Sequence, residues 1–87
     1  MKSRQELMKI LYETIHTRTV QSVHGGQLPL ISWRAVRIIG KKYSYDPKPT
    51  LLIILEMEKR GMIHSRWNKK RGLFEYTSRK KRGVVQK

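Results

Sequence analysis

The sequence predicts a domain of the α+β class that is mainly helical, with three helices, a short strand between the first two, and a C-terminal β-hairpin. Apolar residues recur at helical spacing in three segments before Gly61, and after it the apolar period changes to two. A chain of 87 residues has room for one small hydrophobic core, and without cysteine no disulfide supports it. We therefore expect one domain over residues 1–78 and a basic tail over residues 79–87.

The first helix is predicted to run from Arg4 to about Thr17. Ser3 and Glu6 have the spacing of a capping box, in which each residue bonds the backbone amide of the other. An apolar stripe at helical spacing follows, formed by Leu7, Ile10, Leu11 and Ile15.

The segment from Thr17 to Gly26 has two open interpretations. Its β-branched residues favour extended structure, and Gly25-Gly26 could close a hairpin onto the residues that follow. Alternatively, the first helix frays there into a loop. Because Pro29 has no amide hydrogen to donate, the piece from Leu28 to Ile31 can be only a short or edge strand.

Ser32 is the expected N-cap of a second helix, which spans Trp33 to Tyr43. Four of its residues share an apolar face: Trp33, Val36, Ile39 and Tyr43. A basic stripe at three- and four-residue spacing is either a solvated face or a set of backbone phosphate contacts; it consists of Arg34, Arg37 and Lys41.

Asp46 and Pro47 predict the start of a third helix, since aspartate caps free amides and proline is pre-set for the first turn. This helix is expected to extend to about Arg60 and to end at Gly61, the residue type suited to a left-handed C-cap. Its core face is formed by Thr50, Ile53, Ile54 and Met57.

Three leucines of the third helix lie largely off that core face: Leu51, Leu52 and Leu55. Two explanations stay open. Either the first helix, the hairpin or the C-terminal tail covers them, or they form a subunit interface, because an exposed apolar patch commonly marks a contact. The second explanation predicts a homodimer.

The hairpin is predicted from two alternating segments joined by the polar connection Lys69-Lys70-Arg71-Gly72. The first segment runs from Ile63 to Trp67 and the second from Leu73 to Thr77. Four aromatic residues invite a base-stacking interpretation but are expected to pack in the core instead: Trp33, Trp67, Phe74 and Tyr76.

The run M-E-K-R-G-M-I from Met57 to Ile63 is similar to the ending L-E-K-x-G-L-I of the recognition helix in MarR-like and PadR-like regulators. The run L-F-E-Y-T-S from Leu73 to Ser78 is similar to their returning wing strand and the Y-x-L-T that follows it. Over about Arg4 to Ser78 the order of elements also resembles the winged helix-turn-helix domain.

That resemblance implies a third helix placed at the DNA major groove and a hairpin wing on the flanking backbone or minor groove. Transferred by position, it implies two sets of contacts: Tyr45, Lys48, Leu52 and Lys59 on or just before the third helix, and Arg66, Lys69, Lys70 and Arg71 on the wing.

Twenty Lys and Arg residues against six Asp and Glu residues give a net charge of +14. Residues 59–87 hold eleven basic residues and one acid, Glu75, a local charge of +10, whereas residues 1–58 carry +4. Such an excess concentrates polyanions, and counterion release makes their binding steeply salt dependent and weakly sequence dependent. The tail is either a further contact or a solvated end; its basic residues are Arg79, Lys80, Lys81 and Arg82.

The acids and histidines predict neither catalysis nor a metal site. His16, His24 and His64 lack metal-ligand spacing, and Glu56 and Glu58 fall on different helix faces. The sequence has no phosphate-binding glycine loop and no nucleophile elbow. We expect no enzyme activity, no cofactor and no metal.

The longest apolar run, Leu51 to Leu55, falls far short of the ~20 residues of a membrane-spanning helix, and the chain does not start like a signal peptide. We therefore expect a cytoplasmic, nucleoid-associated protein without membrane contact. The single asparagine and the lack of cysteine indicate a thermophilic source.

Together these observations predict a DNA-binding protein, a transcriptional regulator or a DNA-coating factor, with double-stranded DNA as its partner and a homodimer as its form. Two alternatives remain: an RNA-binding or ribosome-associated basic protein on the same scaffold, and a protein-interaction domain that uses the leucine-bearing helix. Because leucine cannot make the paired hydrogen bonds that distinguish base edges, the charge argues for gripping the backbone more than for reading a sequence.

Overall fold

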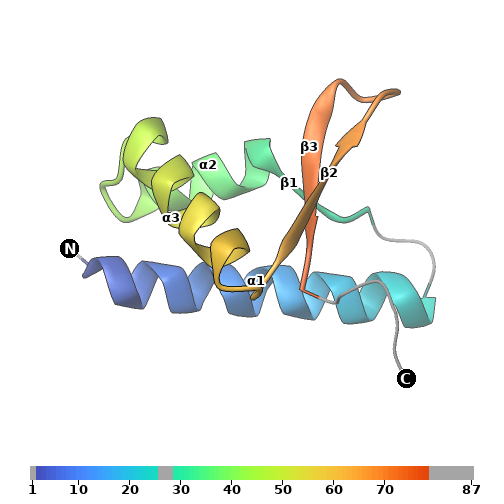
Figure 1. The fold of residues 1–87 in the computed structure, drawn as a ribbon, viewed down its shortest axis with the longest axis horizontal. Helices are drawn as coiled ribbons and strands as arrows, with labels where there is room; N and C mark the ends of the chain where they lie inside the picture. Colours follow the sequence, from blue (N-terminus) through green and yellow to red (C-terminus); the bar gives the residue numbers. More distant parts are fainter. Residues whose placement is uncertain (1, 26–28, 79–87) are drawn as a thin grey trace.

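The computed structural model describes residues 2–25 and 29–78. Three helices, a short strand and a C-terminal hairpin follow one another in the predicted order (Figure 1). The elements are α1 (Arg4–Gly25), β1 (Ile31–Ser32), α2 (Trp33–Lys42), α3 (Pro47–Lys59), β2 (His64–Asn68) and β3 (Leu73–Thr77). The predicted fold class is therefore confirmed.

Helix α1 begins as predicted but is longer than predicted. The capping box forms: the Ser3 amide donates to Oε1 of Glu6 at 2.9 Å, and the Glu6 amide donates to the Ser3 hydroxyl at 3.2 Å. The helix then continues through Thr17 to Gly25, so both the loop and the strand expected there are wrong. Thr19 explains why, since its buried hydroxyl donates to the Ile15 carbonyl and accepts from the Ser78 amide at the end of the hairpin. Packing against the end of the chain thus overrides the β preference of this segment.

The three strands form an antiparallel sheet in the order β1-β3-β2. The expected strand from Leu28 to Ile31 is shifted: Leu28 lies outside the described residues, and β1 starts at Ile31, which pairs with Tyr76. In the hairpin, Arg66 faces Glu75 across the two strands. Strand β3 therefore lies in the middle, and β1 ties the start of α2 to the hairpin.

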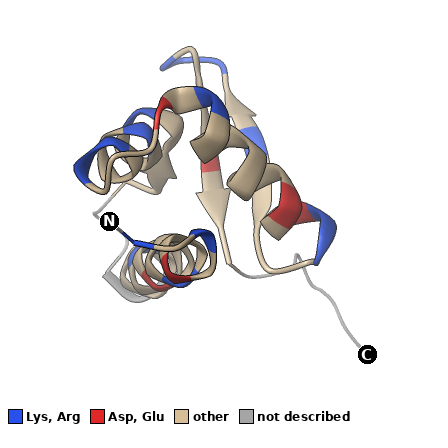
Figure 2. Ribbon diagram, turned by 90° about the vertical axis from the view of Figure 1, so that its left-hand side faces the viewer, with Lys and Arg blue, Asp and Glu red and all other residues tan. Residues whose placement is uncertain are grey.

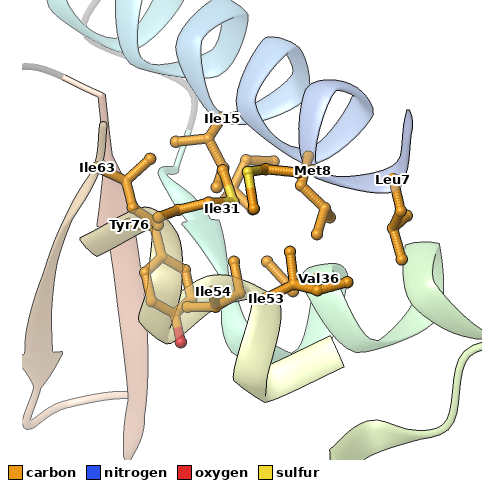
Figure 3. Close-up of a cluster of buried hydrophobic side chains, with 11 residues drawn as sticks. Leu7, Met8, Ile15, Ile31, Val36, Ile53, Ile54, Ile63 and Tyr76 are labelled. Atoms are coloured by element: carbon orange, nitrogen blue, oxygen red, sulfur yellow. The ribbon is translucent and has the colours of Figure 1, made fainter. Parts of the chain in front are cut away.

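The core lies where α1, α3 and the base of the hairpin meet (Figure 3). Its buried apolar residues come from the three helices, from β1 and β3, and from Ile63 just before β2: Leu7, Met8, Leu11, Ile15, Ile31, Val36, Ile53, Ile54, Met57, Ile63 and Tyr76. The predicted apolar faces of the helices pack in or against the core, including Thr50 on α3, which is fully buried; the exception is Ile10 of α1, which is half-buried and lies outside the core cluster. Burial of these aliphatic side chains is the main stabilising contribution in a protein without disulfides.

Helices α2 and α3 approach each other closely at Gly40. A Cβ atom added there would lie 2.2 Å from the Thr50 hydroxyl oxygen and 2.9 Å from its methyl carbon. The Gly40 carbonyl accepts from the amides of Tyr43 and Tyr45 at 3.0 and 2.9 Å, which fixes the turn between the helices. Only glycine fits at this crossing without displacing Thr50.

The helix ends agree with the sequence, with one exception. The Ser32 hydroxyl accepts from the Ala35 amide at 3.3 Å and caps α2, and Gly61 has a left-handed φ of 76° after α3. Asp46 is the N-cap of α3, but its side chain makes no capping hydrogen bond. Pro49 at the third helical position removes one of the two amides from which an N-cap side chain can accept, so only the Lys48 amide remains.

Three helices followed by an antiparallel hairpin give a winged-helix-like topology, in which α2 and α3 form the helix pair and β2–β3 the wing. None of the helices in the described part of the chain is long and apolar enough to cross a membrane.

Candidate nucleic-acid interface

The turn of the hairpin is held by backbone geometry and by Asn68. The Asn68 side-chain oxygen accepts from the Arg71 amide at 3.1 Å, and its backbone carbonyl accepts from the Gly72 amide at 2.8 Å. Gly72 has a left-handed φ of 66°, which a residue with a side chain adopts only at a cost. Lys69 and Lys70 occupy the outside of this turn and are exposed.

Glu75 organises the cations on one face of the hairpin. Its side chain is only 5% exposed, and its two oxygens lie 3.6 Å from the Arg66 guanidinium and 3.4 Å from that of Arg71. Asn68 also donates to this carboxylate, at 3.0 Å. From the sequence, Glu75 was recognised only as the one acid of a basic segment. Its role was detectable only from the strand register, which sets it opposite Arg66.

The structure thus brings all four predicted wing residues together on one hairpin. The side chains of Arg66 and Arg71 remain 69% and 46% exposed although both lie near Glu75. A guanidinium has five N–H donors, so each arginine retains donors for an outside acceptor. The wing therefore presents two free ammonium groups and two oriented guanidinium groups to solvent.

A second group of cations lies on α2. Arg34, Arg37 and Lys41 are all exposed, as the predicted basic stripe requires. Ile38, on the same helix, is 63% exposed. Figure 2 shows Lys and Arg on the hairpin turn, along α2 and near the start of α3.

The four residues proposed on or just before the third helix differ in their exposure and contacts. Lys48, in the first turn of α3, and Leu52 are exposed. Lys59 is exposed at the other end of the helix, roughly 16 Å from Lys48 at the usual helical rise. Tyr45 is half-buried: it packs against the core, and its hydroxyl donates to the Lys2 carbonyl at 3.0 Å.

The leucines of α3 are exposed: Leu51 by 39%, Leu52 by 52% and Leu55 by 49%. Coverage by α1 or by the hairpin is therefore wrong as an explanation. The tail, Arg79 to Arg82 included, lies outside the described residues.

Two of the four aromatic residues are not in the core. Tyr76 is buried and Trp33 packs against the core, as predicted. Trp67 and Phe74 are 54% and 46% exposed, which contradicts the expectation of core packing. The pattern of alternation was right, but the turn end of the hairpin rises clear of the helices, so the helices do not cover these rings (Figure 1).

Two carboxylates, those of Glu56 and Glu75, form ion pairs with arginines. Glu56 on α3 accepts from Arg4 of α1 at 2.9 Å and also pairs with Arg60. Hydrogen bonds from Arg4 and then from Arg60 lower the pKa of Glu56. Within residues 2–25 and 29–78, no lysine lies in an ion pair with a carboxylate. The excess positive charge is therefore available at the surface.

No group of three or more histidine, aspartate or glutamate side chains in the described ranges is arranged to hold a metal ion. His16 contacts the Ser78 hydroxyl at 2.8 Å and His64 is exposed, while the His24 side chain lies outside what is described.

Comparison with known proteins gave no match: neither a family model, nor a curated protein, nor a solved structure resembles this chain closely enough to be significant.

Proposed function

We propose that this protein binds double-stranded DNA by gripping the phosphate backbone with its wing. The observation that carries the proposal is the cationic hairpin turn, on which Lys69 and Lys70 are free and Arg66 and Arg71 are oriented by one buried carboxylate. Three cations on a turn held by Asn68, with Arg66 on the adjoining strand β2, can meet several phosphates at once, and each contact releases condensed counterions. The exposed cations of α2 extend the same positive surface.

Helix α3 lies at the major groove in this proposal, with Lys48 as its phosphate contact. Prolines occupy the first and third helical positions, so Lys48 is the only one of the first three residues with an amide to offer an anion. The exposed Leu52 can meet thymine methyl groups but cannot read hydrogen-bond patterns. The expected result is binding with weak sequence preference, as in a DNA-coating factor or a regulator of broad specificity.

A second candidate function is association through α3. Three leucines between 39% and 52% exposed form a patch on one helix, and such patches commonly mark contacts between proteins. A second copy of this chain would bury the same patch on both sides and give the homodimer expected from the sequence.

The role of the wing is tested by comparing two double variants, each of which loses two positive charges, one on the wing and one elsewhere. Duplex DNA, single-stranded DNA and an RNA hairpin are titrated at several salt concentrations, with fluorescence anisotropy as the measurement. In the Lys69→Ala/Lys70→Ala variant the negative slope of log affinity against log salt for duplex DNA should become shallower by about 1.8, because two phosphate contacts are lost. The variant Lys2→Ala/Lys9→Ala removes the same charge from the start of the chain and α1, away from the hairpin turn, and should leave the slope nearly unchanged.

Equal slopes for the wing variant and the wild type would exclude the wing as the contact. Tighter binding of the RNA hairpin than of the duplex at equal salt would replace DNA with RNA as the partner. Indifference to all three nucleic acids would leave association through α3 as the function.

A further inference from the structure

The wing has two chemically different faces. Side chains alternate between the faces of a strand, so Arg66 and Glu75 lie on one face and their neighbours Trp67 and Phe74 on the other. The first face carries the ion pairs around the Glu75 carboxylate. The second face carries the two large rings, and phosphate contacts give no reason for them.

The aromatic face is closed at its base and open toward the turn. Ser65 and Tyr76 share this face; the Ser65 hydroxyl donates to Glu58 of α3 at 2.7 Å, and Tyr76 is buried. Two residues nearer the turn on each strand, the rings of Trp67 and Phe74 are 54% and 46% exposed. The same face that completes the core at one end therefore projects two rings into solvent at the other.

The two rings form an edge-to-face pair. Trp67 and Phe74 are direct cross-strand partners, with ring centroids 5.1 Å apart and an interplanar angle of 72°. In this geometry the edge of one ring meets the face of the other, so flat aromatic surface remains open. The cations of the turn, Lys69 and Lys70, follow Trp67 within three positions of the chain.

We propose that this aromatic pair stacks on unpaired bases, so that the preferred ligand is a duplex that adjoins a single-stranded segment. The inference rests on the nucleic-acid binding proposed above and names the form of nucleic acid that the wing recognises. Bases inside a duplex are already stacked on their neighbours, whereas an unpaired base offers its face to an aromatic ring, whatever its identity. The wing lysines hold the phosphates beside the junction, and the rings accept the first unpaired bases.

This preference suits the rest of the surface. The exposed leucines of α3 offer no hydrogen-bond donors for base edges. Stacking and phosphate contacts are both tolerant of sequence, so the protein would recognise a structural feature of the nucleic acid in place of a base sequence.

The two rings also stabilise the hairpin, as cross-strand aromatic pairs do. The two roles predict different measurements. A purely structural pair affects the stability of the hairpin and the affinity for every ligand alike. A stacking pair affects the ratio between the affinities for two ligands that differ only in unpaired bases.

The test compares a blunt duplex of about 20 base pairs, two helical turns, with the same duplex carrying an overhang of about six nucleotides. Anisotropy titrations at equal salt should show the wild type binding the overhang duplex at least about fivefold more tightly, the lower end of one base–aromatic stack. The Trp67→Leu/Phe74→Leu variant should lose this ratio and keep both its affinity for the blunt duplex and its salt slope. Circular dichroism checks that this variant is folded.

Three further variants separate stacking from charge, from apolar contact and from folding. Lys69→Ala/Lys70→Ala should weaken both ligands equally and keep the ratio. Ile38→Ser removes an exposed apolar side chain from α2 and should also keep it. Trp67→Tyr retains a ring that stacks and should preserve most of the ratio even if the leucine variant fails to fold.

Stacking also has a direct optical signature. The chain has two tryptophans, so a Trp33→Phe variant leaves Trp67 as the fluorophore. Its emission should be quenched by the overhang duplex and much less by the blunt one. Equal affinities of the wild type for the two ligands, or a ratio that survives in a folded Trp67→Leu/Phe74→Leu variant, would overturn the inference while leaving duplex binding intact. Absence of binding to either ligand would overturn the proposed function itself.

Discussion

The helix pair α2–α3 and the hairpin β2–β3 are each two elements joined by a short turn, yet they are built in opposite ways. The helix pair is closed: Gly40 leaves no space for even a methyl group beside the buried Thr50. The hairpin is open: hydrogen bonds of the Asn68 side chain hold its turn, and the rings of Trp67 and Phe74 are about half exposed. The difference teaches that stability and the proposed binding reside in separate parts of the molecule, so substitutions should affect one without the other.

The largest expected effect on stability comes from adding a methyl group at the crossing of α2 and α3. Gly40→Ala should lower the free energy of unfolding by about 2–3 kcal/mol, because overpacking outweighs the roughly 1 kcal/mol that alanine gains over glycine in a helix. The new Cβ would lie 2.2 Å from the Thr50 hydroxyl oxygen, so one of the helices must shift. Urea unfolding measures the loss, and affinity for duplex DNA per folded molecule should not change.

The matched control combines Gly40→Ala with Thr50→Ala, which removes the clashing atoms. The double variant should lose less stability than the sum of the two single variants, because the residues are in contact. Additive losses would show that the crossing at Gly40 is not tightly packed.

The same contrast explains which parts of the fold could be predicted from the sequence. The ends of α2 and α3 were predictable, because Ser32, Pro47 and Gly61 act through local backbone chemistry. The extension of α1 was not, because it depends on a contact between Thr19 and Ser78, which are far apart in the chain. Local signals thus set the helix pair, and long-range contacts decide the rest.

The candidate site divides in the same way. The four wing cations follow from the alternation and the turn residues, and the structure places them together. The role of Glu75 and the exposure of Trp67 and Phe74 depend on the register and on how far the hairpin extends past the helices. A local sequence pattern does not show how far the hairpin extends past the helices.

A smaller effect on the free energy of unfolding is expected from raising the pH, which ionises Tyr76 at the base of the hairpin. Tyr76 shares a face of the hairpin with Trp67 and Phe74 but is buried. Burial, and then the charge of Glu58, raise the pKa of the Tyr76 phenol to about 12. The phenol is neutral when protonated and ionises near its ordinary pKa of about 10 in the unfolded chain, so its contribution is complete below pH ~10 and is lost as the pH rises toward 12. Between about pH 9 and pH 11 the loss amounts to about 1 kcal/mol.

The measurement is urea unfolding of the wild type and of Tyr76→Phe at both pH values. All other ionisable groups are the same in the two proteins, so their effects cancel in the difference. The stability of the wild type relative to the variant should fall with rising pH. A constant difference would mean that the phenol is accessible to water, as the rings nearer the turn are.

The smallest effect on stability is expected from substitutions on the solvent-facing side of α3, where the leucines are exposed. Leu52→Glu and Leu55→Glu replace side chains that are about half exposed, so the free energy of unfolding at low protein concentration should change by no more than about 0.5 kcal/mol. Their effect should fall on association. If the leucines of α3 join two copies, sedimentation of the wild type should show self-association that both variants abolish.

Salt separates this association from nucleic-acid binding. Two copies that each carry +14 repel one another, and added salt screens that repulsion. Self-association through α3 should therefore strengthen as salt rises, whereas binding of duplex DNA through the wing weakens because counterion release becomes less favourable. A wild type that stays monomeric at high protein concentration and high salt would remove α3 as an interface. It would leave the wing as the open surface on which the proposed function depends.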